Sequence, residues 1–143
     1  MGLTPCYDKD YECNYSANGF RLPSRGEWEM AARGGVAGGW DYEYSGGDYP
    51  DNVAWYYSNS SWESGREDYY GTHEVGKKNQ NSLGIYDMSG NVWEWCNRYS
   101  YTDYYYCGGS YYDYEISVTS SNYSNGGSGW EKCGFRLACS LFN

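Results

Sequence analysis

The chain has very few aliphatic side chains from which to build a hydrophobic core. Leu, Ile, Val and Phe together number 15 of 143 residues, and the formal net charge at pH 7 is −9. That combination alone is typical of disordered chains. Seven Trp and 20 Tyr residues change the expectation, because each ring buries on the order of 150–250 Å² when it packs. The sequence therefore predicts a folded domain with an aromatic core, spanning residues 1–143 as one unit.

The charge and hydropathy restrict the partners. The isoelectric point is about 4.4, and the ten Lys and Arg residues form no basic run, so we expect no nucleic-acid binding. No apolar stretch approaches the roughly 20 residues that cross a bilayer, and residues 1–5 show no signal-peptide pattern. We therefore expect no direct membrane insertion.

The six cysteines lie far apart in the sequence. They are Cys6, Cys13, Cys96, Cys107, Cys133 and Cys139. None forms a C-x-x-C pair, and His73 is the sole histidine, so the usual zinc ligand sets have no support. The even count favours disulfides in an oxidising compartment, with Cys6–Cys13 as the first candidate. The alternative is reduced cysteines that pack as small hydrophobic residues.

One helix is clearly marked. Ser24 and Glu27 have the spacing of a capping box, and two glycines follow Arg33. This pattern predicts a helix over Arg25–Arg33, with Trp28 and two alanines on its inner side.

Strands are expected at Val92–Trp95, Tyr104–Tyr114 and Gly134–Cys139, where aromatic and apolar residues gather. Residues 38–81 and 115–132 are rich in Gly, Ser, Asn and Asp, which predicts long loops. In the second loop, Ile116 and Val118 alone suggest an inward face. These elements predict an α+β domain that is loop-rich, with short strands and few helices.

Four blocks carry a family resemblance. They read GFRLPSRGEWEMAARGG at residues 19–35, GIYDMSGNVWEW at 84–95, GGS at 108–110 and GFR at 134–136. In this order they resemble the formylglycine-generating enzyme (sulfatase-modifying factor) family. The resemblance implies a C-type lectin fold of the formylglycine-generating-enzyme-like kind.

The resemblance does not extend to the enzyme's chemistry. In that family, two cysteines a few residues after GGS bind copper and oxidise a substrate cysteine. Residues 111–119 contain no cysteine, and His73 alone cannot replace the histidine-rich site of iron-dependent relatives. We therefore expect no enzyme and no catalytic residues or cofactor. The oxidase alternative would have to use Cys107 and Cys133.

The segment after the GNVWEW block has an unusual composition. From Tyr99 it repeats Tyr, Ser, Asp, Asn and Gly, as in YSYTDYYY, SYYDYE and SSNYSNGGSG. Antibody paratopes are enriched in the same residue types, and base changes at the adenines of AAY asparagine codons largely produce them. The chain thus resembles variable proteins of diversity-generating retroelements, with a variable region at about residues 99–132. The alternative is a binding module that is not diversified.

This resemblance implies a ligand-binding protein, displayed outside the cell on a cell surface or virion, whose variable face binds varied protein or glycan targets. We expect the face to be rigid and rich in tyrosine, with Tyr111 belonging to the framework. The predicted contact residues are Tyr104, Tyr106, Tyr112, Asp113, Tyr114, Ser117, Ser120, Asn122 and Tyr123.

The resemblance also implies a structural calcium ion held by oxygen atoms. Its ligands would be Asp87, Gly90, Val92 and Glu94. The alternative is that Asp87 caps the turn and Glu94 pairs with an arginine, either Arg21 or Arg136. Trp93 and Trp95 are expected to pack in the core. The EPN, QPD and WND triplets of sugar-binding lectins are absent from the sequence.

Overall fold

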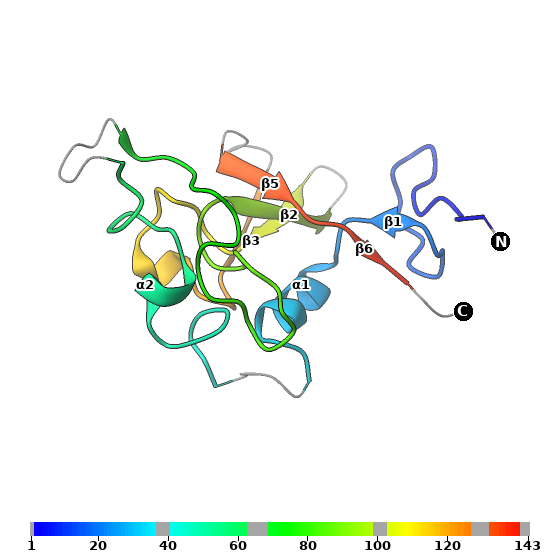
Figure 1. Cartoon of the computed structure of the whole chain (residues 1–143). Helices are drawn as coiled ribbons and strands as arrows, with labels where there is room; N and C mark the ends of the chain where they lie inside the picture. Colours follow the sequence, from blue (N-terminus) through cyan, green and yellow to red (C-terminus); the bar gives the residue numbers. More distant parts are fainter. Residues whose placement is uncertain (1, 37–40, 63–68, 99–102, 127–131, 141–143) are drawn as a thin grey trace.

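The computed structural model describes residues 2–36, 41–62, 69–98, 103–126 and 132–140. Figure 1 shows helix α1 beside a small sheet, with long loops on one side and the two chain ends on the other. None of the helices within these ranges has the length and hydropathy that a membrane-spanning segment needs.

Helix α1 spans Arg25–Ala32 and begins with the predicted capping box. The Glu27 N–H donates to Ser24 Oγ at 3.2 Å, and the Ser24 N–H donates to Glu27 Oε2 at 2.8 Å. These bonds satisfy two amides that a helix start leaves open. Arg33 is the C-cap, and Trp28 and Ala32 are buried as expected.

The main sheet has four short strands in the order β4-β3-β2-β5. Strand β2 pairs antiparallel with β3 and parallel with β5, and β3 pairs antiparallel with β4. The bounds are β2 Trp93–Arg98, β3 Tyr104–Cys107, β4 Tyr123–Gly126 and β5 Cys133–Phe135. The strand expected over Tyr104–Tyr114 thus ends at Cys107, because two glycines follow with φ of 92° and 72°, a conformation that breaks a strand.

The expected closing strand is divided between two sheets. Its first part is β5, and its second part is β6, Ala138–Cys139, which pairs with β1, Phe20–Arg21. Figure 1 shows this β1–β6 pair at the end of the molecule where both termini lie. Among the described residues, the loops also contain the short helix α2 at Pro50–Val53 and the 3₁₀ helix η2 at Glu115–Ser117.

Two small clusters form the core. The first lies between α1 and the sheet and contains Trp28, Ala32, Met88, Cys96 and Cys107. The second lies beneath the loops and contains Tyr44, Val53, Ala54, Tyr56 and Val118. Of the two residues expected to point inward from this loop, Val118 is buried, whereas Ile116 on η2 is 76% exposed.

The cysteines are free thiols, which corrects the expected Cys6–Cys13 disulfide. The buried Cys6 thiol donates to the Gly19 carbonyl oxygen at 3.1 Å. Cys96 and Cys107 face each other across β2 and β3 with their sulfur atoms 3.6 Å apart. The reduced alternative therefore describes this structure, because buried thiols here pack and donate as small side chains.

Candidate functional site

Four tyrosine rings gather where the loop after α2 meets the segment after the GGS block. We call Tyr57, Tyr70, Tyr112 and Tyr114 the tyrosine cluster. The Tyr57 and Tyr70 rings stack with centroids 4.6 Å apart, and Tyr114 lies 5.0 Å from Tyr57. The Tyr112 ring meets the Tyr57 and Tyr70 rings edge-on, with centroids 5.8 and 6.1 Å away. Tyr112 and Tyr114 are 46% and 66% exposed, so the cluster offers aromatic area to solvent.

Asp113 fixes the loop between the two exposed rings. Its Oδ2 atom accepts hydrogen bonds from Trp93 Nε1 at 2.8 Å and from the Ser110 backbone N–H at 2.9 Å. The Ser110 hydroxyl donates to the same oxygen, and the Asp113 carbonyl accepts from the Tyr57 N–H at 2.9 Å. Asp113 was predicted as a ligand contact, whereas its carboxylate here holds the loop to the sheet.

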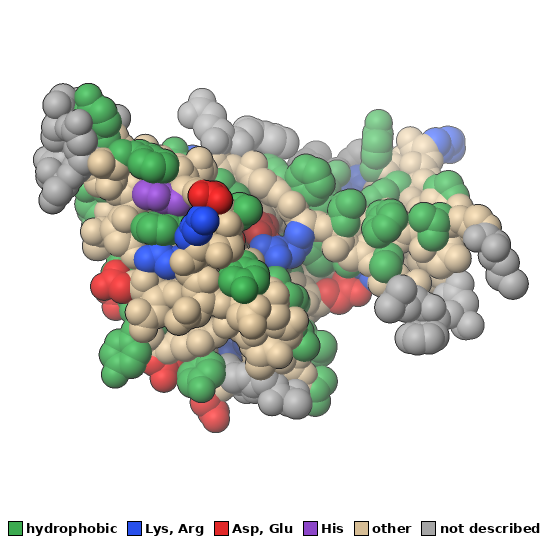
Figure 2. Space-filling view, in the orientation of Figure 1, with side chains coloured by type: hydrophobic (Ala, Val, Ile, Leu, Met, Phe, Trp, Pro, Cys, Tyr) green, Lys and Arg blue, Asp and Glu red, His purple; other side chains and the backbone are tan. Residues whose placement is uncertain are grey.

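A stack of rings anchors the segment that carries Tyr57 and Tyr70. His73 lies between Trp55 and Trp62, with ring centroids 3.9 and 4.3 Å away. It is the purple side chain in Figure 2, with green side chains on both sides and blue ones beside it. Lys78 Nζ lies 3.9 Å from the Trp55 ring centroid, and burial lowers the pKa of that ammonium. These ring contacts join Trp55, Trp62 and His73, which lie in the described residues on either side of Tyr57 and Tyr70.

Sequence reasoning missed Tyr57 and Tyr70 as site residues. Both lie outside the predicted variable region and belong to a segment that reads as an irregular loop. The available signal was the upstream run of tyrosines at 56–57 and 69–70. That run did not reveal which tyrosines meet the later loop, because the contacts join residues 42 to 57 positions apart.

Tyr104 and Tyr106 lie on the sheet face next to Trp93 and Trp95. Tyr106 meets Trp93 and Trp95 edge-on at 5.1 and 5.6 Å, and Tyr104 meets Trp95 at 6.0 Å. All four side chains are partly buried. The two tryptophans therefore lie outside both core clusters, which corrects their expected core position.

Tyr123 lies apart from the tyrosine cluster. Its strand partner is Cys107, so its side chain shares the sheet face that packs on α1. There its ring meets Tyr105 at 5.5 Å, and the Arg25 guanidinium lies 4.4 Å from its centroid. Tyr123 is 46% exposed but belongs to another face than Tyr104 and Tyr106.

The remaining polar residues of the predicted face serve the framework. Ser120 is 1% exposed, and its hydroxyl donates to the Glu43 carbonyl oxygen at 3.0 Å, which corrects its expected exposure. The Asn122 amide donates to the Ser117 carbonyl oxygen at 2.6 Å, and both residues are partly buried. Residues 99–102 and 127–131 of the predicted variable region lie outside the described residues.

Glu94 has the arginine partner that the sequence left as an alternative. The Arg136 guanidinium contacts both Glu94 carboxylate oxygens, and Trp28 Nε1 donates to Oε2 at 2.6 Å. Asp87 accepts from the Gly76 N–H at 2.7 Å. Within the described ranges, no three acidic, His or Cys side chains form a metal-binding group. Arg136 and Trp28 thus engage Glu94 as the arginine alternative expects, and the calcium site on Asp87, Gly90, Val92 and Glu94 stays a prediction.

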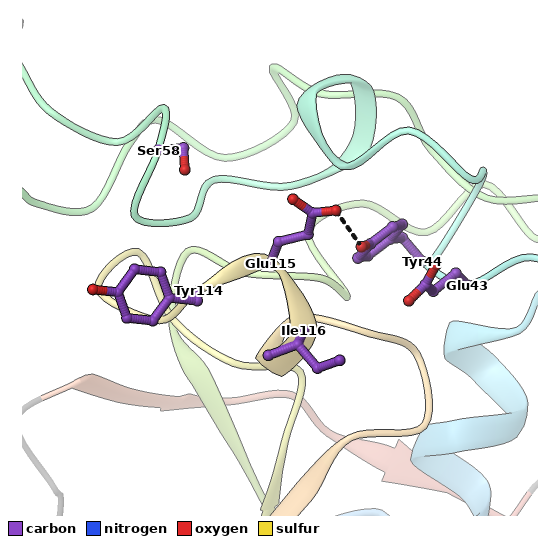
Figure 3. A pocket seen from close by; sticks show the side chains of 6 residues that line it. All are labelled: Glu43, Tyr44, Ser58, Tyr114, Glu115 and Ile116. Atoms are coloured by element: carbon purple, nitrogen blue, oxygen red, sulfur yellow. Dashed lines mark hydrogen bonds between the residues drawn. The ribbon is translucent and has the colours of Figure 1, made fainter.

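A cavity of about 340 Å³ lies beside the tyrosine cluster. Six residues line it, and Figure 3 shows Glu115 between the Tyr114 ring and Tyr44. The lining residues are Glu43, Tyr44, Ser58, Tyr114, Glu115 and Ile116. The Tyr44 hydroxyl donates to Glu115 Oε1 at 3.4 Å. Burial, together with the charges of Glu43 and Glu115, raises the pKa of Tyr44 to about 12.

Comparison with known proteins assigns the framework. The family model of the sulfatase-modifying factor enzyme 1-like domain matches residues 7–141. The chain is 46% identical over 92 residues to the chaperone protein LppX of Paenibacillus barcinonensis, covering 58% of this chain and 32% of that one. It is 40% identical over 82 residues to the formylglycine-generating enzyme of Thermomonospora curvata, covering 54% and 27%. The chain thus spans about a third or less of these curated relatives.

A solved structure is also similar. Treponema denticola variable protein 1 superposes with a TM-score of 0.75 at 34% identity, covering 90% of this chain and 50% of that chain. These likenesses confirm the predicted resemblance and the α+β C-type lectin fold of the formylglycine-generating-enzyme-like kind.

Proposed function

Because the chain belongs to the sulfatase-modifying factor enzyme 1-like family, we propose that it uses this framework to bind ligands rather than to catalyse a reaction. The tyrosine cluster is the observation that carries the proposal. Exposed rings at 112 and 114 rest on framework rings at 57 and 70, so the surface is ordered before a ligand arrives. Pre-ordered side chains lose little conformational entropy on binding.

The finer proposal is that a retroelement diversifies part of this surface. The similarity to Treponema denticola variable protein 1 supports a variable binding role in general terms. The composition of residues 99–132 supports diversification of this region in particular. The ligands would be proteins or glycans, and the protein would be displayed outside the cell on a cell surface or virion.

Two features support a role without catalysis. Residues 111–119, where the family's oxidases carry their cysteine pair, contain none. Cys107, one of the two remaining candidates, is 1% exposed and faces Cys96. Its partner candidate, Cys133, lies on β5 at the opposite side of β2 from β3. Neither arrangement offers an accessible thiol pair to a substrate.

The test is to sequence the coding region from many individuals of the source population and score substitutions codon by codon. We expect changes at AAY-derived codons for exposed side chains, above all Tyr112 and Tyr114. The codons for Tyr57, Tyr70 and Ser120 serve as matched controls and should stay unchanged, because these residues support the surface. Sparse variation spread evenly over the chain would contradict diversification and favour one dedicated ligand.

A further inference from the structure

The cavity in Figure 3 combines an aromatic wall with carboxylates. Tyr114 forms one side, and Glu115 projects from η2 between Tyr114 and Tyr44. Tyr114 is 66% exposed, and its ring packs on the Tyr57 ring with centroids 5.0 Å apart. A ligand in the cavity would therefore meet a fixed ring and a carboxylate together.

The charge of the cavity is negative. Its six described lining residues include Glu43 and Glu115 but neither Lys nor Arg. Figure 3 shows one Glu115 oxygen directed at the Tyr44 hydroxyl and the other turned away from it. The chain as a whole carries a net charge of −9, so the surrounding field also attracts cations.

The adjoining tyrosine cluster already holds a cation. Lys132 Nζ lies 4.0 Å from the centroid of the Tyr112 ring. This distance is that of a cation–π contact, in which the negative face of the ring attracts the ammonium. The neighbouring Tyr114 ring has the same chemistry, with a carboxylate beside it instead of a lysine.

We propose that this cavity receives an arginine side chain of a protein partner, stacked on Tyr114 and paired with Glu115. Arginine fits better than lysine, because its planar guanidinium stacks on rings and presents parallel N–H donors to a carboxylate. The proposal rests on the proposed binding function and names one chemical preference of that surface. Glu43 and Glu115 would favour a basic segment of the partner over an acidic one.

The probe is N-acetyl-arginine amide, titrated into the ¹⁵N-labelled protein and followed by chemical-shift changes. We expect weak, saturable binding with shifts at Tyr114 and Glu115. N-acetyl-citrulline amide, which has nearly the same shape without the charge, should bind about two- to five-fold more weakly, the range expected for one exposed charge pair. Equal binding of both compounds, or shifts confined to other parts of the chain, would overturn the proposal.

Variants separate the ring from the charge. Glu115→Gln should weaken arginine amide binding about five-fold, and Tyr114→Ala should weaken it similarly, whereas Tyr114→Phe should retain it. Glu74→Gln is the control, because Glu74 is an exposed carboxylate paired with Lys77 outside the cavity. Circular dichroism verifies that each variant is folded. Unchanged binding by folded Glu115→Gln would contradict the assignment.

The two proposals fail separately. If population sequencing shows no diversification while arginine amide binds as expected, the cavity is a fixed arginine site. If diversification is found and the protein binds arginine amide and citrulline amide equally well, the cavity proposal is wrong. The binding surface then recognises a group other than an arginine side chain.

Discussion

The Trp93 indole N–H donates a 2.8 Å hydrogen bond to the Asp113 carboxylate, twenty residues further along the chain. This bond joins strand β2 to the loop that presents Tyr112 and Tyr114. The same carboxylate oxygen accepts two bonds from Ser110. One side chain within the predicted variable region thus has a framework role.

Replacement of Asp113 should therefore destabilise the fold. Asp113→Ala leaves the Trp93 and Ser110 donors without their acceptor, which costs on the order of 2–3 kcal/mol. Urea unfolding followed by tryptophan fluorescence measures the loss. Asp10→Asn is the control, because the exposed Asp10 carboxylate contacts Lys9 at 3.8 Å while the bonds of Asp10 to Asp8 and Arg98 use its backbone, and it should change stability by less than about 0.5 kcal/mol. Equal stability of both variants would contradict the framework role.

The buried tyrosines should make the fold sensitive to alkali. Burial is the main cause that raises the pKa of both Tyr44 and Tyr56 to about 12, from the ordinary value of 10.0. An unfolded chain ionises these phenols near pH 10, so their stabilising contribution is complete below that pH and is lost as the pH rises toward 12. The melting temperature should fall over this interval.

Phenylalanine variants test the alkaline prediction. Tyr44→Phe and Tyr56→Phe remove an ionisable group, so each should show a smaller fall in melting temperature between pH 10 and 12 than the parent chain. Tyr112→Phe is the control, because Tyr112 is 46% exposed, and it should behave as the parent does. If the melting temperatures of Tyr44→Phe and Tyr56→Phe both fell as far as that of the parent chain, the two tyrosines would not be the cause of the alkaline sensitivity.

We expect the ion pair between Glu94 and Arg136, and not a calcium ion, to stabilise the GNVWEW block. Because the guanidinium already occupies the Glu94 oxygens, we expect the melting temperature to be the same in calcium and in a chelator. Glu94→Gln should cost about 3 kcal/mol, since it leaves a partly buried arginine without its counter-charge. A clear rise of the melting temperature with calcium, abolished in Glu94→Gln, would instead support the calcium site.

The cysteines should differ in reactivity. The hydrogen bond with Cys107, together with burial, raises the pKa of Cys96, and the thiolate is the form that alkylating reagents attack. Cys139 is exposed and should be alkylated within the native protein at pH 8, whereas Cys6, Cys96 and Cys107 should react only after unfolding. Mass spectrometry of the digested protein identifies the labelled positions. Native labelling of Cys96 as rapid as that of Cys139 would contradict the buried, reduced pair.

Local interactions explain the parts of the fold that were correctly expected. The capping box joins residues three positions apart, so Ser24 and Glu27 predict the start of α1 without knowledge of what the helix packs against. The two glycines after Ser24's helix likewise mark its end. The end of strand β3 could not be predicted from the sequence. Gly108 and Gly109 are visible there, but the positive φ angles with which they end the strand are not.

The sequence by itself determined that this chain folds around aromatic rings, where α1 begins, and which family's framework it resembles, since these follow from composition and short motifs. Only the tertiary structure decided that Tyr57 and Tyr70 support Tyr112 and Tyr114, that Asp113 and Ser120 are framework residues, and that Glu94 pairs with Arg136. The physical reason is that each of these contacts joins segments 20 to 80 residues apart. Their formation depends on how the loops pack, which no local pattern encodes.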